Sequence, residues 1–270
     1  MLERHANAVL MLFTVLAVLL SLPSVDAIVG EFEVSIFGNN VVSSFSSVLG
    51  GQDNTVAAEG SSIGGGEENR IATGAVRSFI AGGFQNTIFN NTNHSFVGGG
   101  SENSLVVAHS AVLAGGLDNL ITGCSYSAIG GGAENKAAAS YATVSGGIDN
   151  TVTGEHSTIG GGDNNIVSDQ HGTIGGGIGN TVSAQHGTVA GGNSNKVNAT
   201  TSTVSGGSNN SAFAIECSVG GGRNNLAFAD AATVGGGVQN SAMQTYSTIS
   251  GGYENYISPP ISDQNHMSFI

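Results

Sequence analysis

Aliphatic side chains recur at a fixed distance before an Asn along almost the whole chain. Each of these Asn residues ends the pattern Gly-Gly-x-x-Asn, and an aliphatic residue stands six positions before it. The fourteen Asn are Asn54, Asn69, Asn86, Asn103, Asn119, Asn135, Asn150, Asn165, Asn180, Asn195, Asn210, Asn225, Asn240 and Asn255. Their positions differ first by 15, 17, 17, 16 and 16, and then by 15 eight times in succession. Such a register indicates one structural unit repeated along the chain.

A second apolar column lies two positions after the Asn. It includes Val56, Ile71, Val152, Val167, Val182, Val197, Ala212, Ala227 and Ala242. Short β-branched segments alternate with Gly, Asn and Asp corners, which indicates short strands joined by tight turns. Helical repeats need about 33 residues or more, and this much Gly disfavours helix. We therefore predict an all-β fold, a parallel β-solenoid of about fourteen coils with two strands per coil and both apolar columns facing inward.

The Gly-Gly-x-x-Asn segment is expected to form a corner of each coil. Gly tolerates positive φ and close approach between coils, which a corner requires. The Asn is expected to be buried there, with its amide bonded to the equivalent Asn above and below, as in stacked Asn ladders. A calcium-binding role is disfavoured, because the residue before the Asn is variously Asp, Glu, Gln, Asn, Gly or Ser.

The N-terminal segment 1–27 has the pattern of a signal peptide. Arg4 and His5 precede an apolar run over residues 8–20, and a small-residue segment suited to cleavage ends at Ala27. The run is short for a membrane span, although an uncleaved anchor is the alternative. The expected organisation is a signal peptide over 1–27, an N-terminal cap over 28–45, the solenoid over 46–257 and a tail over 258–270.

Composition and motifs narrow the functional class. Six Lys and Arg stand against 19 Asp and Glu, which gives a net charge of −13. Nucleic acid is therefore not an expected partner, because phosphate binding needs basic side chains. The chain has no H-E-x-x-H and no P-loop motif. We expect a protein that is not an enzyme and needs no cofactor.

Two segments carry a family resemblance. ATVSGGIDNTVTGEHSTIGGG (Ala142–Gly162) and TVSAQHGTVAGG (Thr181–Gly192) resemble the head repeats of trimeric autotransporter adhesins, the YadA-like family. The similarity extends over residues 36–257, although the unit is longer here and nothing after Asn255 resembles that family's stalk or anchor. The resemblance implies a left-handed parallel β-roll, a homotrimer, and adhesion to an extracellular surface, matrix protein or glycan.

Three His residues recur at one position of consecutive repeats. His156, His171 and His186 each stand nine positions before a ladder Asn, so we expect them to be exposed and spaced by about 4.8 Å. Such a row suits a transition metal or a response to pH. No column of carboxylates or Cys completes a ligand set, however. An exposed polar row is therefore the favoured interpretation, and no metal site is predicted.

Thr residues recur seven positions before the Asn. They are Thr143, Thr158, Thr173, Thr188, Thr203, Thr233 and Thr248. Regularly spaced Thr on a flat solenoid suits ice binding, whereas the preference of Thr for strands accounts for the same column without any ligand.

The lengthened repeats hold a group of Phe residues. Phe79, Phe84, Phe89 and Phe96 lie in the stretch 70–126, where the spacing exceeds 15. Insertions in solenoids form loops, often on the binding face. The stretch is therefore a candidate recognition surface, with loop variation near a cap as the alternative.

The two Cys and the four glycosylation motifs bear on the cellular compartment in which the protein folds. Cys124 and Cys217 are too far apart along a solenoid to form a disulfide within one chain. Cys217 is expected to be a buried thiol, whereas Cys124 falls in a lengthened repeat and is expected to be exposed. Asn-x-Ser/Thr motifs, which carry glycans only in a eukaryotic secretory pathway, occur at Asn90, Asn93, Asn198 and Asn209.

The sequence therefore predicts a secreted or cell-surface repeat protein, without enzymatic activity, that acts as an extracellular adhesion module. The alternative is an ice-binding or purely structural β-solenoid.

Overall fold

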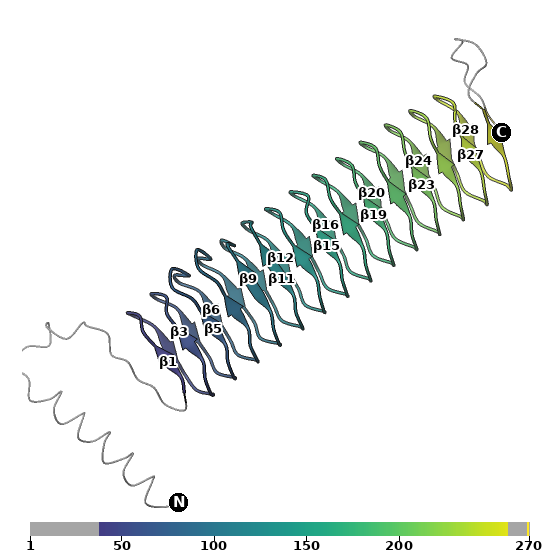
Figure 1. Ribbon diagram of the computed structural model, residues 1–270. Helices are drawn as coiled ribbons and strands as arrows, with labels where there is room; N and C mark the ends of the chain where they lie inside the picture. The colour runs from purple at the N-terminus through teal and green to yellow at the C-terminus, as the bar shows by residue number, and fades with distance from the viewer. Residues whose placement is uncertain (1–37, 259–268, 270) are drawn as a thin grey trace, which may run out of the picture. The chain divides into compact units, whose positions relative to one another are not determined.

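The chain folds into a stack of parallel β-strands. The computed structural model describes residues 38–258 and Phe269, and these residues contain strands and turns but no helix (Figure 1). The predicted signal peptide lies outside the described residues, as does most of the predicted tail. The described part of the chain also contains no apolar helix of membrane-spanning length.

The odd-numbered strands form one sheet, which we name sheet A. This 15-stranded sheet keeps the strands in chain order. They are β1 (Asn40–Val41), β3 (Thr55–Val56), β5 (Arg70–Ile71), β7 (Thr87–Ile88), β9 (Ser104–Val106), β11 (Leu120–Thr122), β13 (Lys136–Ala137), β15 (Thr151–Val152), β17 (Ile166–Val167), β19 (Thr181–Val182), β21 (Lys196–Val197), β23 (Ser211–Ala212), β25 (Leu226–Ala227), β27 (Ser241–Ala242) and β29 (Tyr256–Ile257).

The even-numbered strands form the second sheet, sheet B, which is 14-stranded and also keeps chain order. They are β2 (Ser47–Val48), β4 (Ser62–Ile63), β6 (Phe79–Ile80), β8 (Phe96–Val97), β10 (Val112–Leu113), β12 (Ala128–Ile129), β14 (Thr143–Val144), β16 (Thr158–Ile159), β18 (Thr173–Ile174), β20 (Thr188–Val189), β22 (Thr203–Val204), β24 (Ser218–Val219), β26 (Thr233–Val234) and β28 (Thr248–Ile249).

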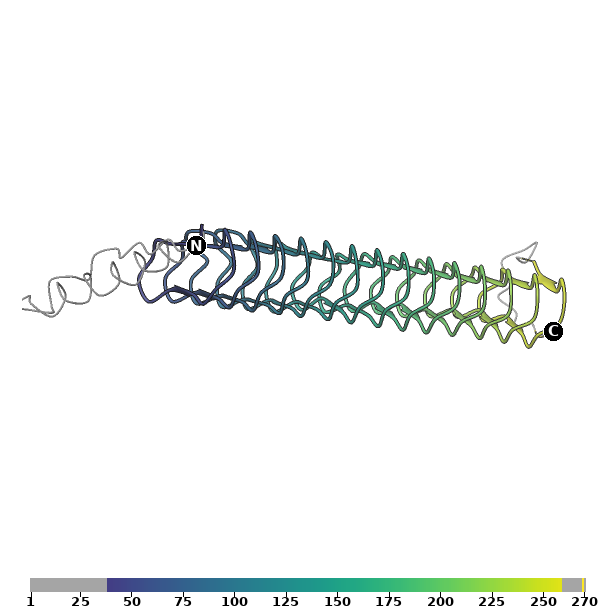
Figure 2. The same ribbon diagram turned by 90° about the horizontal axis from the view of Figure 1, so that it is seen from below.

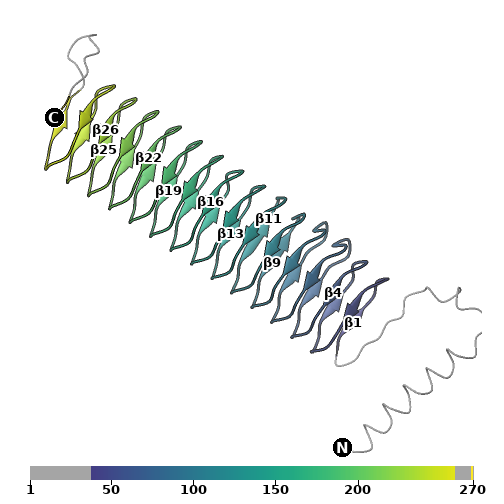
Figure 3. The same cartoon turned by 180° about the vertical axis from the view of Figure 1, so that it is seen from behind.

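Every strand pairs with the strand one coil away, in parallel and in register. Thr158 of β16 lies beside Thr143 of β14 and Thr173 of β18, and Val152 of β15 lies beside Val167 of β17. Figure 3, the opposite view, shows the same order of coils from behind. The predicted fold class is therefore confirmed: the chain is a parallel β-solenoid of about 15 turns with two sheets.

The core consists of the two apolar columns that the sequence predicts. Ile159, six positions before a ladder Asn, and Val167, two positions after it, are both fully buried. The outward neighbour of each strand residue stays half-buried or exposed, because successive side chains of a strand point to opposite faces. The interior is thin, so stability must come from stacking many coils.

A third row of parallel contacts lies two positions before the ladder Asn, and the sequence pattern did not reveal it. We name it the bridge row, and it consists of Gln52, Glu67, Phe84, Ser101, Leu117, Ala133, Ile148, Asp163, Ile178, Asn193, Ser208, Arg223, Val238 and Tyr253. Each coil is therefore held to its neighbours along three lines.

The solenoid begins one coil earlier than the fourteen Asn indicate. Strand β1 pairs with β3, and Asn39 occupies the ladder position 15 residues before Asn54. Residues 38–45, which the sequence assigns to a cap, thus contribute to the first coil. The sequence of residues 36–42 is a degenerate, glycine-poor copy of the repeat, which favours the interpretation as a cap.

Candidate functional site: the turn edge of the solenoid

The buried Asn side chains form a continuous ladder. The backbone N–H of Asn150 and its Nδ2 both donate to Oδ1 of Asn135, at 3.1 and 3.0 Å. The same Nδ2 donates to the carbonyls of Gly146 at 3.1 Å and of Gly162, in the next coil, at 2.9 Å. The predicted bonds between successive Asn are therefore present. The saturated amides stabilise the corner and are unavailable to an outside ligand.

The ladder is not uniform along the chain. The bond from Nδ2 to the preceding Oδ1 is present at every step from Asn54 to Asn180 and again at Asn240. At Asn195, Asn210, Asn225 and Asn255, only the backbone N–H donates to that oxygen.

The second Gly of each pair is required by crowding. Gly147 has φ of 94°, and a Cβ there would lie 2.1 Å from the carbonyl oxygen of Gly162 and 2.6 Å from Nδ2 of Asn150. A Cβ on Gly146, by contrast, would meet nothing closer than 3.9 Å. The predicted close approach between coils therefore concerns the second Gly.

Eight positions before the ladder Asn, Ser recurs in many coils and bonds to the backbone, although Ala, Gly or Cys takes its place at Ala111, Ala142, Gly172, Gly187, Cys217 and Ala232. Oγ of Ser157 donates to the carbonyl of Asp169 and accepts from the N–H of Gly172, both at 2.9 Å. Ser247, in the last such position, has the one buried side-chain oxygen without a partner among the described residues. The recurrence of Ser at this position was the sequence signal for this row.

Variation in coil length is confined to one edge of the solenoid. We use the name turn edge for the set of turns that lead from each sheet A strand to the next sheet B strand. These turns cover residues 72–78 after β5 and 89–95 after β7, but only 138–142 after β13. The return connection, such as 81–86 or 145–150, has the same length in every coil. The longer turns lie in the blue part of Figure 1.

Five rings from consecutive coils stack along the turn edge. We name this set the ring row: Tyr126, Tyr141, His156, His171 and His186. Neighbouring ring centroids lie 5.2, 4.5, 5.2 and 4.8 Å apart, with interplanar angles of 15°, 8°, 7° and 5°. All five residues have φ between 55° and 59°. Figure 2 shows the turns of successive coils following one another along the edges.

The ring row is exposed, as the sequence predicts for its His residues. Tyr126 and Tyr141 are 60% and 49% exposed, and the three His are also exposed. The rings face each other, so their edges, with the Tyr hydroxyls and imidazole nitrogens, are what a partner would meet. No group of three or more His, Cys, Asp or Glu within the described residues is arranged to hold a metal ion.

The four Phe of the lengthened repeats do not form one cluster. Phe79 and Phe96 stack on the outer side of sheet B, with centroids 6.0 Å apart. Phe84 belongs to the bridge row, and Phe89 begins a turn after β7. Each is 37–38% exposed. The four residues thus follow three different rows, which the sequence could not distinguish before the coil was known.

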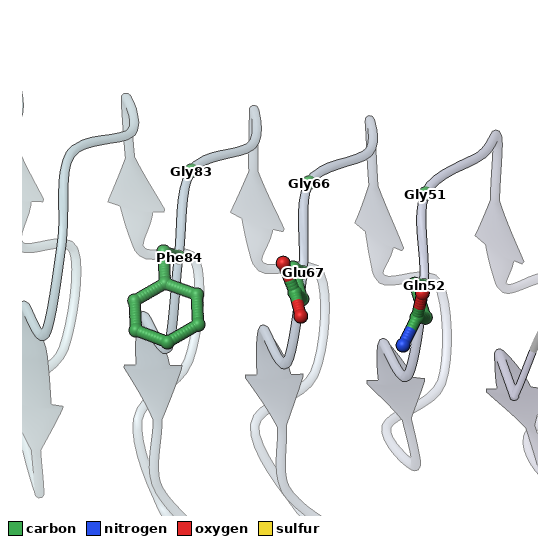
Figure 4. A pocket seen from close by; sticks show the side chains of 6 residues that line it. All are labelled: Gly51, Gln52, Gly66, Glu67, Gly83 and Phe84. Carbon is green, nitrogen blue, oxygen red and sulfur yellow. The ribbon is translucent and has the colours of Figure 1, made fainter.

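A shallow hollow lies beside the start of the bridge row. Gly51, Gly66 and Gly83 form its floor, and the side chains of Gln52, Glu67 and Phe84 project from three consecutive coils (Figure 4). Glu67 is its single titratable group. The hollow therefore offers neither a paired acid and base nor a nucleophile with a base.

The two Cys are both buried and unpaired. The burial expected for Cys217 is confirmed, but the exposure expected for Cys124 is wrong. Cys124 points into the coil, only 4% exposed, and its Sγ lies 3.9 Å from the carbonyl oxygen of Ala137. Burial raises the pKa of the Cys124 thiol. An interchain disulfide at this residue is therefore disfavoured.

The remaining candidates lie on the surface of the coils. The predicted Thr column is the outward row of sheet B, where Thr143, Thr158 and Thr173 are direct neighbours. Of the glycosylation motifs, Asn90 and Asn93 lie in the turn 89–95, and Asn198 lies on the same turn edge. Asn209 precedes a ladder Asn and is exposed.

The sequence matches no protein-family model and no curated protein. The class of protein is therefore defined by the fold: a β-solenoid repeat protein compatible with a β-roll.

Proposed function

We propose that the protein is a non-enzymatic extracellular adhesion module that binds its partner along the turn edge. The partner would be a matrix protein or a neutral glycan on a surface. The resemblance of the repeats to trimeric adhesin heads supports the adhesive role, and the signal-peptide pattern of segment 1–27 supports secretion.

One observation carries this proposal. Coil length varies only on the turn edge, and the same edge carries the stacked ring row over five consecutive coils that begin with the last lengthened one. The corners and the return connections are constant because the Asn ladder and the Gly contacts constrain them. In repeat proteins, insertions on one face commonly mark the binding face.

The ring row suits a repeated, shallow contact. Its rings are already ordered by stacking, so binding costs little side-chain entropy. A single Tyr or His edge binds weakly, but five in line can engage a repetitive surface together, which raises the overall affinity. With a net charge of −13, the chain is unsuited to strongly anionic polymers, which leaves neutral or basic partners.

The test replaces the ring row without altering the coil. Thr201 stands at the corresponding position of a regular coil with φ of 57°, so Thr is tolerated there. We expect H156T/H171T/H186T to keep its circular dichroism and to lose at least about tenfold in affinity for immobilised matrix proteins or neutral glycans.

The matched control changes the same three coils on another face. In T158S/T173S/T188S the substitutions lie on sheet B, and binding should be unchanged. Equal binding by the unmodified chain and both triple variants would refute the turn edge as the adhesive surface.

A second candidate function is ice binding. Thr or Ser occupies the outward row of sheet B in eight consecutive coils from Thr143 to Thr248, in parallel register. The test is thermal hysteresis of the full chain. Activity that T173K abolishes and H171T leaves intact would favour this candidate, and no hysteresis would exclude it.

A further inference from the structure

The hydrogen bonds of sheet A have a direction along the solenoid. The N–H of Thr151 donates to the carbonyl of Asn165 at 2.9 Å, and the N–H of Thr153 donates to the carbonyl of Val167 at 2.8 Å. The same two bonds recur from coil to coil. In each coil, the N–H groups of the first strand residue and of the residue after the strand therefore donate toward the C-terminal end, to carbonyls of the next coil.

The last coil ends with donors that have no acceptor in the described part of the chain. By the pattern above, the N–H groups of Tyr256 and Ser258 would donate to a further coil, but among the described strands β29 pairs only with β27. Asn255 is likewise the last Asn of the ladder in the described residues. Sheet B is already extended at this end, because Phe269 pairs with Thr248 in parallel.

The first coil presents the complementary groups. Among the described strands β1 pairs only with β3, and within the described residues no N–H donates to the carbonyl of Val41. Phe45 and Leu49 of this coil are 84% and 77% exposed. Neither β1 nor β29 contains Lys or Pro, the residues that commonly protect a free edge from pairing, although Pro259 and Pro260 follow Ser258 in the sequence.

We propose that two copies of this chain associate head to tail, with β29 of one copy pairing in parallel with β1 of the next. Tyr256 would lie beside Asn40 and Ile257 beside Val41 of the second copy, and the Ser258 N–H would donate to the Val41 carbonyl. Phe269, which pairs with Thr248, lies at the next sheet B position, between the two sheet A strands to be joined.

This contact joins two different surfaces, so it does not close. A heterologous interface of this kind continues into a linear assembly of coaxial solenoids. It multiplies the number of binding edges along one axis, yet it follows from strand pairing alone and does not depend on the adhesive role.

The experiment joins the two edges with a disulfide. N40C and Y256C are made as separate full chains and mixed in a glutathione buffer. In-register neighbours in parallel strands lie about 4.8 Å apart, within the range that a disulfide spans. The native Cys are buried and should not interfere. We expect a covalent N40C–Y256C dimer, and a series of multimers from the chain that carries both substitutions.

The control places the second Cys on the same row in the middle of the solenoid. A mixture of N40C with T181C should give no more dimer than N40C alone. Sedimentation of the unmodified chain should show mass increasing with concentration. A monomer at all concentrations, together with no linking of N40C to Y256C above the T181C control, would overturn the proposal. A dimer linked N40C to N40C would instead show head-to-head contact and would also overturn it.

Discussion

The lengthened coils between Asn69 and Asn135 and the regular coils that follow share one scaffold but differ at the surface. Both have the same Asn ladder, Gly contacts and inward aliphatic residues. On sheet B, however, the outward row holds Phe79, Phe96 and Val112 in the lengthened coils, and Thr and Ser in the regular coils. The buried corner therefore constrains the repeat, while the turn edge and the outward rows vary.

The charge at the corner also changes along the solenoid. The residue before each ladder Asn has positive φ in both regions. It is Glu102, Asp118, Glu134 and Asp149 in four consecutive coils, and then Asn164, Gly179, Ser194 and Asn209 in the next four. The conformation is thus fixed by the corner, whereas the charge is free to change along the solenoid.

The largest effect is expected from the second Gly of a pair, and it should be equal in both regions. G147A in a regular coil and G100A in a lengthened coil each place a Cβ 2.1 Å from a Gly carbonyl oxygen of the next coil. Each should lower the free energy of unfolding by about 3 kcal/mol or more. Urea denaturation measures this loss. G191A, at the first Gly of a pair in another regular coil, is the control: Gly191 has no positive φ, a Cβ there would meet nothing closer than 3.8 Å, and the substitution should cost less than about 1 kcal/mol. A mild effect of G147A would contradict the close approach of the corners.

Within the shared Asn ladder, the coils at Asn195, Asn210 and Asn225 should differ from the lengthened coils, because they have only the backbone bond to the preceding Asn oxygen. Asn103 makes side-chain hydrogen bonds to both of its neighbours in the ladder. Its Nδ2 donates to Oδ1 of Asn86, and its Oδ1 accepts from Nδ2 of Asn119, both at 3.0 Å. At Asn210 the corresponding bonds come from backbone N–H groups alone: that of Asn210 donates to Oδ1 of Asn195, and that of Asn225 donates to Oδ1 of Asn210. We expect N103A to be more destabilising than N210A by about 1–2 kcal/mol, at roughly 1 kcal/mol per bond. Equal losses of unfolding free energy for N103A and N210A in urea denaturation would show that the ladder contributes equally at both positions.

A stabilising substitution is expected in the lengthened turns. Val107 has φ of 49°, which is unfavourable for a β-branched residue, and Gly123 holds the equivalent position of the next coil with φ of 64°. V107N should raise the free energy of unfolding by about 1 kcal/mol, because Asn tolerates this conformation better. The melting temperature checks the sign. V106N, in strand β9 beside it, is the control and should not stabilise.

The smallest effect is expected on the ring row. H171T removes one exposed ring from a regular turn, and Thr is already present at the equivalent Thr201. The free energy of unfolding should change by less than about 0.5 kcal/mol, as for most surface substitutions. Thermal denaturation checks this, and a loss above about 1 kcal/mol would mean that stacking holds the solenoid together rather than serving recognition.

The sequence by itself determined the repeat, the two strands per coil, the inward columns and the buried Asn, because a fixed period forces equivalent residues into equivalent positions. It assigned the degenerate copy around Asn39 to a cap rather than to a coil, because the Gly-Gly pair is missing there. It did not reveal the buried Ser row, and it wrongly placed Cys124 at the surface.

Only the tertiary structure decided which distant side chains meet. It confined the extra residues to the turn edge, separated Phe79 and Phe96 from Phe84 and Phe89, and joined two Tyr to three His in one row. The physical reason is that the turns decide which way the equivalent side chains of successive coils face. Without the turns, the sequence does not show which columns share one surface. Those turns depend on contacts with the next coil, which the residues of one repeat do not contain.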